Sequence, residues 1–92
     1  MQYKESERFR RAFLHLPRHI QEKTLKALKL FRDNPRHPSL RARKMEGKEG
    51  VWEARVDLSY RFTFHYEPDA TTGETLCVFR NVGPHSILDV SP

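Results

Sequence analysis

The sequence predicts an α+β fold in which two N-terminal antiparallel helices pack on one face of a small, mainly antiparallel four-stranded sheet. Apolar residues recur with a helical period up to residue 34, and beyond residue 38 they alternate with a period of two. The chain has 92 residues, which suits one small domain and is too short for two. Residues 1–92 are therefore expected to form a single domain.

Two helices are expected in the first part of the chain. The first should cover Glu5–Leu16, whose apolar residues have the spacing of an amphipathic helix: Phe9, Ala12, Phe13 and Leu16. Pro17 suits the opening turn of a second helix, and Pro35 should end it because proline disfavours helical geometry at the preceding residue. The second helix should bury four apolar residues: Ile20, Leu25, Leu28 and Phe31.

Four strands are expected after the helices, over residues 40–45, 51–56, 60–66 and 74–80. The third has the clearest pattern, because four aromatic residues alternate with polar ones: Tyr60, Phe62, Phe64 and Tyr66. This aromatic face should pack on the helices. The tail, Gly83–Pro92, is expected to form one short helical turn.

The alternate side chains of these strands should lie on the opposite face of the sheet, which we expect to be open to solvent. Arg55 and Arg61 flank a three-residue turn, so they should be neighbours on that face, with His65 farther along. Three cations of the preceding strand should extend this anion-binding surface: Arg41, Arg43 and Lys44. The pattern therefore predicts an anion-binding face, and side chains such as Arg61 should be replaceable there without loss of folding.

The charge is distributed unevenly along the chain. Residues 1–50 carry fourteen Lys or Arg and six Asp or Glu, a net charge of +8, whereas residues 51–92 carry three and six, a net charge of −3. A basic half predicts a polyanionic partner such as RNA. Solvated helix side chains explain the same charge equally well, and this alternative holds especially for three lysines of the second helix: Lys23, Lys26 and Lys29.

Several classes of protein are excluded by composition. Cys77 is the only cysteine, so the chain can form neither an internal disulfide nor a cysteine-based zinc site. His15 and His19 have metal-ligand spacing, but Pro17 lies between them and no third ligand follows. No apolar run approaches the ~20 residues of a membrane span, and the N-terminus lacks the apolar stretch of a signal peptide. We expect a cytoplasmic protein without metal or cofactor.

The chain also resembles a known family. The resemblance rests on two runs of residues, HPSLRARKMEGKEGVWEARVDLSYRFTFHYE and CVFRNVGPHSILD. These runs resemble the RelE/ParE superfamily of bacterial toxins, and most of all its RelE-like and YafQ-like messenger-RNA endoribonucleases. Such toxins have an N-terminal strand, for which Gln2–Lys4 leaves room only if it is very short. The resemblance implies metal-free cleavage of translating messenger RNA by attack of the ribose 2′-hydroxyl, mostly in the ribosomal A site.

The same resemblance implies roles and partners. Arg61 corresponds to the arginine that stabilises the phosphate in the transition state, and Arg55 to a basic residue near the 2′-hydroxyl. His85 corresponds to the group that protonates the leaving oxygen, and Arg80 corresponds more loosely to a second arginine. The expected partners are an acidic antitoxin, the ribosome and messenger RNA, with operator DNA bound only by the toxin–antitoxin complex.

The general base is left open by the sequence. An arginine is a poor base because it keeps its proton, so His65, Glu53 or ribosomal RNA should accept the proton of the 2′-hydroxyl. Structural roles compete with these assignments. Arg61 could only pair with Glu53 or Asp57 across the hairpin, and His85 could be an ordinary surface histidine.

Two other functions fit the same resemblance. One is a non-catalytic ParE-like toxin that binds a protein target such as DNA gyrase. The other is a degenerate member that keeps only antitoxin and operator binding. An endoribonuclease requires Arg55, Arg61 and His85 to converge on one phosphate, whereas the two binding proteins do not.

Overall fold

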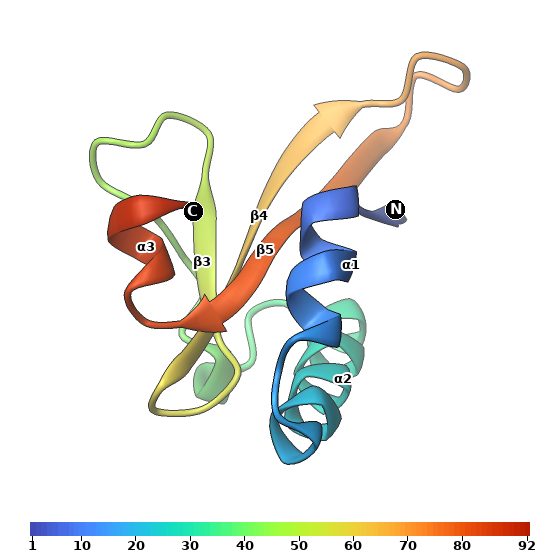
Figure 1. The fold of residues 1–92 in the computed structure, drawn as a ribbon. Coiled ribbons are helices and arrows are strands. Elements are labelled where there is room, and N and C mark those ends of the chain that lie inside the picture. The colour runs from blue at the N-terminus through green and yellow to red at the C-terminus, as the bar shows by residue number, and fades with distance from the viewer.

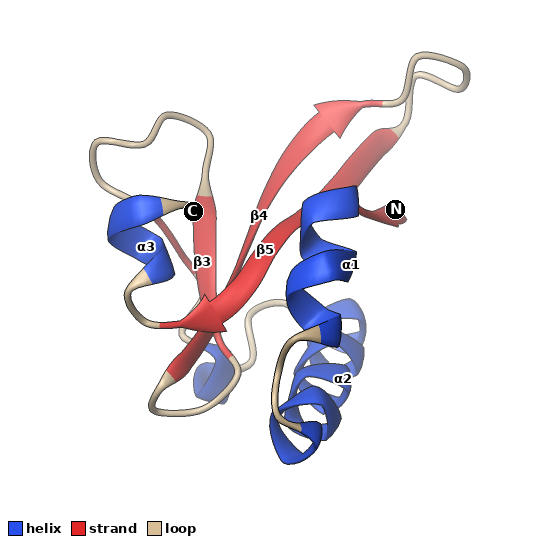
Figure 2. Cartoon of the chain, in the orientation of Figure 1, coloured by secondary structure: helices blue, strands red, loops and turns tan.

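The computed structural model describes residues 1–92, and it contains a mixed five-stranded sheet with helices on both faces (Figures 1 and 2). The elements in chain order are β1 (Gln2–Glu5), α1 (Glu7–Leu14), α2 (Arg18–Asp33), the 3₁₀ turn η1 (Pro38–Leu40), β2 (Arg43–Lys44), β3 (Trp52–Arg55), β4 (Tyr60–Pro68), β5 (Thr75–Pro84) and α3 (Ile87–Val90). The strand order across the sheet is β1-β5-β4-β3-β2. None of the helices has the length and apolar character needed to cross a membrane.

The sheet differs from the prediction at its two edges. β1 pairs in parallel with β5, with Gln2 opposite Leu76, so the expected four-stranded sheet is wrong by one strand. A four-residue strand is too short to show a period, and its parallel partner lies more than 70 residues away in sequence. The strand expected over residues 40–45 is reduced to Arg43–Lys44, because Leu40 belongs to η1.

The helices follow the predicted boundaries closely. α1 begins after Ser6, whose Oγ accepts the main-chain N–H of Phe9 at 3.0 Å and so caps the helix. α2 begins after Pro17 and ends before Pro35, as predicted. Leu25 is a correction, because it is 57% exposed; Ala27 is buried on the face that meets the sheet. Leu25 is five residues from Ile20, about 140° around the helix, and therefore lies off that face.

An aromatic core joins the helices to the sheet, as the alternating pattern predicted. Phe31 of α2 is 1% exposed and lies at its centre. Its ring centroid is 4.6 Å from that of Phe64 and 5.8 Å from those of Phe62 and Phe79, all in edge-to-face geometry. The core therefore fixes which face of β4 points toward the helices.

The opposite face is covered in part, contrary to prediction. β5 runs to Pro84, four residues beyond its expected end, and the chain then turns back as α3 over the sheet (Figure 1). Leu88 is buried there, and the Asn81 side chain donates to the main-chain oxygen of Ser91 at 2.6 Å. The Arg8 guanidinium donates to the main-chain oxygen of Pro92 at 2.7 Å, which holds the tail down.

Candidate functional site

The β3–β4 hairpin brings the two predicted arginines together. Arg55 and Arg61 are direct cross-strand partners, and Arg61 lies opposite Gly83 of β5 on its other side. Arg43 of β2 lies opposite Glu53 of β3. By the alternation of the strands, all these residues share the face that carries α3.

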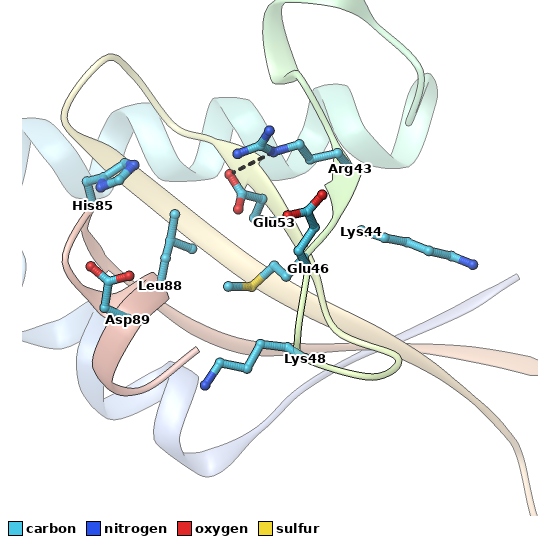
Figure 3. Close-up of a pocket in the computed structure, with 9 residues that line it drawn as sticks. Arg43, Lys44, Glu46, Lys48, Glu53, His85, Leu88 and Asp89 are labelled. Atoms are coloured by element: carbon cyan, nitrogen blue, oxygen red, sulfur yellow. Dashed lines mark ion pairs between the residues drawn. The ribbon is translucent and has the colours of Figure 1, made fainter.

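A pocket of about 690 Å³ lies between this face and α3 (Figure 3). We call it the α3 pocket, and it is lined by Arg43, Lys44, Met45, Glu46, Lys48, Glu53, His85, Leu88 and Asp89. Figure 3 shows His85 at one side of the pocket and Glu53 near its centre. A histidine and a carboxylate from distant parts of the chain therefore face one cavity. Glu46, Lys48 and Asp89 were not predicted, because their loop and tail have no periodic pattern.

Glu53 is the buried acid of the α3 pocket. It is 8% exposed, and its Oε1 lies 3.5 Å from Nε of the exposed Arg43. A charged carboxylate that is this deeply buried needs a cationic partner. The exposed side chain of Arg43 is that partner. Arg43 is thus the only one of the three predicted β2 cations that contributes to this face as expected.

Arg61 holds the β3–β4 turn together. It is 6% exposed, and one guanidinium nitrogen donates to the main-chain oxygens of Asp57, Leu58 and Tyr60 at 2.7, 3.2 and 3.0 Å. The residue forms no ion pair across the hairpin. Its expected exposure is corrected, because the tail and the turn enclose it. Arg61 therefore has a structural role whatever else it does.

The surroundings of Arg61 disfavour the charged form of its guanidinium. Burial lowers the pKa of the Arg61 guanidinium, and the positive charge of Arg55 lowers it further. The carboxylates of Glu53 and Asp57 act in the opposite direction. Two cations held side by side in a partly buried site favour the binding of an anion between or beside them.

Asp57 orders the same turn. Its Oδ1 accepts the main-chain N–H groups of Ser59 and Tyr60, each at 2.8 Å, and its Oδ2 lies 3.3 Å from Nζ of Lys23. The main-chain oxygen of Ser59 in turn accepts the N–H of His85 at 2.9 Å. Lys23 is therefore paired rather than merely solvated, and the turn positions His85 beside the sheet.

The pKa of Asp57 predicts an acid-sensitive turn. Burial alone would raise the pKa, but the hydrogen bonds and Lys23 outweigh it, so the pKa lies below its usual value. The ionised form then contributes stability above about pH 4 that is lost as the pH falls through the folded-state pKa. Urea unfolding should show that Asp57→Asn has a lower free energy of unfolding than wild type at pH 7. The difference in free energy of unfolding between the two proteins should be smaller at pH 3. The exposed Asp33→Asn is the control, and a gap of equal size at both pH values would contradict this role.

Gly83 allows α3 to approach the sheet. A Cβ built at this position would lie 2.8 Å from Cγ2 of Ile87. Gly83→Ala should therefore push α3 and the neighbouring His85 outward and cost about 1–3 kcal/mol of stability. The cost should be much smaller in an Ile87→Ala background, which removes the clashing atom. Thermal unfolding of the four variants of this double-mutant cycle checks the coupling, and additive costs would contradict it.

Arg80 and His65 form a separate cluster. Asn81 pairs with Thr63 and Phe79 with Phe64, so Arg80 is the unpaired residue of a bulge in β5. Arg80 donates to Nδ1 of His65 at 2.8 Å, which leaves the proton on Nε2, 3.0 Å from the Glu67 carboxylate. His65 lies four residues from Arg61 along β4, about 13 Å away. These two predicted residues are therefore not brought to the α3 pocket.

Arg41 and Lys44 also lie apart from the predicted face. Lys44 borders the α3 pocket, but it is opposite Trp52 in the ladder, and Figure 3 shows its side chain pointing away from the pocket. Its ammonium lies 5.6 Å from the centroid of the Trp52 ring. Arg41 follows η1 with a φ of 46°, which ends the alternation that the sequence suggested.

No reactive thiol or histidine metal site belongs to the described chain. Cys77 is fully buried in the core, as predicted, and burial raises the pKa of its thiol to about 12. No three His, Cys, Asp or Glu side chains are grouped as metal ligands. The chemistry available at the α3 pocket is therefore that of three carboxylates, one histidine, one arginine and two lysines.

Comparisons with known proteins identify the fold. No protein-family model matches the sequence, and no curated protein matches it. YafQ from E. coli superposes with a TM-score of 0.73 at 17% identity, over 95% of this chain and 96% of that one. A chain of the RelB–RelE complex from Methanococcus jannaschii superposes with a TM-score of 0.68 at 20% identity, over 100% of both chains. The YoeB/ParE toxin from Agrobacterium tumefaciens superposes with a TM-score of 0.69 at 13% identity, over 92% of this chain and 99% of that one. The chain therefore has the fold of the RelE/ParE toxin superfamily.

Proposed function

We propose that this chain is the toxin of a type II toxin–antitoxin pair and that it cleaves translating messenger RNA on the ribosome without a metal ion. The observation that supports the proposal is the position of the Arg55–Arg61 pair along the strands. Arg55 is two residues from Glu53, and Arg61 is opposite Gly83, two residues before His85, and both Glu53 and His85 line the α3 pocket. The fold and the sequence motifs shared with RelE-like toxins support it. Structures of fold relatives contain antitoxins, which supports a cognate acidic antitoxin as partner.

The proposed reaction needs only groups of this chain and the RNA. A base removes the proton of the ribose 2′-hydroxyl, and the oxygen attacks the adjacent phosphorus. The bond from phosphorus to the 5′-oxygen breaks, and an acid protonates that oxygen. The products are a 2′,3′-cyclic phosphate and a 5′-hydroxyl. Proton transfer and charge stabilisation are the two contributions that the protein must make.

We assign the base to Glu53 and the acid to His85. Glu53 lines the α3 pocket with His85, whereas the Nδ1 of His65 is occupied by Arg80 in a different cluster. Arg55, which is partly exposed, is assigned to the developing charge of the phosphorane, with the buried Arg61 behind it. Histidine exchanges protons readily near neutral pH, which suits an acid for the leaving oxygen.

A second candidate function follows from the hydrogen bonds of Arg61. A guanidinium committed to three carbonyl oxygens of a turn is accounted for by structure alone. This observation favours a non-catalytic, ParE-like toxin that binds a protein such as DNA gyrase. Its toxicity would not depend on His85.

Induced expression in bacteria with mapping of messenger-RNA 5′ ends tests the proposal. Wild type should arrest growth and create new ends inside translated codons, whereas Arg55→Ala/His85→Ala should do neither while remaining folded. The matched control is Arg18→Ala/His19→Ala, which removes an exposed arginine and an exposed histidine from α2. Growth arrest without new ends would reject the endoribonuclease and favour the gyrase-binding alternative, for which supercoiling is the next assay.

A further inference from the structure

A second cleft, of about 390 Å³, lies on the α2 side of the sheet. It is bounded by the end of α2, by η1 and by the aromatic residues of β3 and β4. We call it the aromatic cleft, and the lining residues used below are Arg36, His37, Arg41, Trp52 and Tyr66. No acidic residue lines it. Because Trp52 lies opposite Lys44 and faces α2, this cleft is on the other face of the sheet from the α3 pocket.

The two arginines that line the aromatic cleft form no ion pairs. Arg36 and Arg41 are exposed, and neither side chain forms an ion pair. The ammonium of Lys44 lies over the Trp52 ring, 5.6 Å from its centroid. Two arginines therefore line the cleft without a carboxylate, and a third positive charge lies over one of its rings, which favours an anionic ligand.

Arg41 has an unusual main-chain conformation for an arginine. Its φ of 46° is in the left-handed region, and it is the only non-glycine residue of the chain with a positive φ. Arg41 is the C-cap of η1, a position that often takes this conformation, and its main-chain N–H donates to the oxygen of Pro38 at 3.3 Å. The turn leaves the exposed side chain in the lining of the aromatic cleft.

The ring of Tyr66 is available to a planar ligand, whereas Trp52 is stacked on Phe64 with 5.9 Å between centroids and has the Lys44 ammonium over its ring. Tyr66 is 39% exposed, and its ring meets that of Trp52 at 84° with 6.0 Å between centroids. Trp52 is itself only partly buried. Exposed aromatic rings beside arginines bind single-stranded nucleic acid, since bases stack on the rings and phosphates contact the cations.

We propose that the aromatic cleft binds a segment of single-stranded RNA, with a base stacked on Tyr66 next to Trp52 and phosphates at Arg36 and Arg41. An acidic peptide would use the cations but has no planar group for the rings, so RNA accounts for more of the cleft. The inference extends the proposed function, because it gives the chain an RNA contact on the face away from cleavage. It does not require that the chain cleave RNA.

Fluorescence of Trp52, the only tryptophan in the chain, reports directly on this site. The titration uses His85→Ala protein, so that RNA remains intact, and a single-stranded RNA of about eight nucleotides. Saturable quenching of the Trp52 fluorescence is expected.

Tyr66→Leu should weaken RNA binding about ten-fold or more, because the base loses its stacking partner. Arg36→Ala/Arg41→Gly should reduce the slope of log affinity against log salt by about 1.4. Glycine suits the left-handed backbone at position 41, so the fold should be retained.

The control is Arg18→Ala/Lys26→Ala, which removes two unpaired cations of α2 and should leave the Trp52 titration unchanged. The proposal would be overturned if Tyr66→Leu and Arg36→Ala/Arg41→Gly quenched at the same RNA concentrations as wild type. Displacement of the RNA by polyglutamate of equal charge would also overturn it, because a general polyanion surface needs no aromatic rings. RNA binding at the cleft without any cleavage by wild type would reject the proposed function alone.

Discussion

Replacement of His85 by alanine is expected to slow RNA cleavage about 10²–10³-fold, equivalent to ~2.7–4 kcal/mol of transition-state stabilisation. The melting temperature should not change. The side chain is exposed, and the residue is held by its main-chain N–H, which donates to Ser59 and is retained by alanine. Single-turnover cleavage of ribosome-bound messenger RNA and thermal unfolding of the same preparation measure both effects.

His19→Ala is the matched control, because His19 is exposed on α2 and lies outside the residues that line the α3 pocket. It should alter neither the rate nor the melting temperature. A His85→Ala protein that melts as early as a core variant would contradict the placement of His85 on the surface. A folded His85→Ala protein that cleaves at the wild-type rate would contradict its role as the acid.

Replacement of Phe62 by alanine is expected to cost about 3–5 kcal/mol of unfolding free energy, a large share of the ~5–15 kcal/mol typical of a domain. The side chain has no exposed surface, and its ring centroid lies 5.8 Å from that of Phe31 and 5.9 Å from those of Phe64 and Phe79. Alanine would leave a cavity where α2 meets the sheet. Urea unfolding followed by circular dichroism measures the loss.

Leu58→Ala is the control for Phe62→Ala, because Leu58 is 83% exposed and should cost less than about 0.5 kcal/mol. A cost of similar size at both positions would contradict the assignment of the core. The comparison also separates loss of folding from loss of chemistry. Phe62→Ala should lower activity only through unfolding, whereas His85→Ala should slow cleavage in a protein that remains folded.

The faces of the central strands could be predicted from the sequence because a period of two is a local property. The aromatic alternation of Tyr60–Tyr66 assigned one face of β4 to the helices. Together with the short turn it predicted that Arg55 and Arg61 are neighbours, which the register confirms. The same pattern could not indicate what covers the other face. The buried position of Arg61 goes with its hydrogen bonds to the turn carbonyls, which are not encoded by alternation.

The errors in the candidate site arise where the periodicity stops. The bulge at Arg80 shifts that residue out of the ladder and toward His65, and no residue type announces a bulge there. The left-handed turn at Arg41 interrupts the expected strand before Arg41 can join it. Lys44 lies on the α2 side because it follows Arg43 in β2, and adjacent strand residues face opposite sides of the sheet. β1 could not be predicted from the local pattern, because this short edge strand is formed by pairing with β5, which is far away in sequence.

Cleavage of a defined messenger RNA on purified ribosomes tests the central claim most directly. The α3 pocket is proposed to promote attack of the 2′-hydroxyl, so wild-type protein should leave a 2′,3′-cyclic phosphate and a 5′-hydroxyl. A single 2′-deoxynucleotide placed at the cut position should block cleavage there. The Arg55→Ala/His85→Ala protein should leave the all-ribose messenger intact. Continued cleavage at the deoxy position, or no cleavage of ribosome-bound messenger by wild-type protein, would contradict the account.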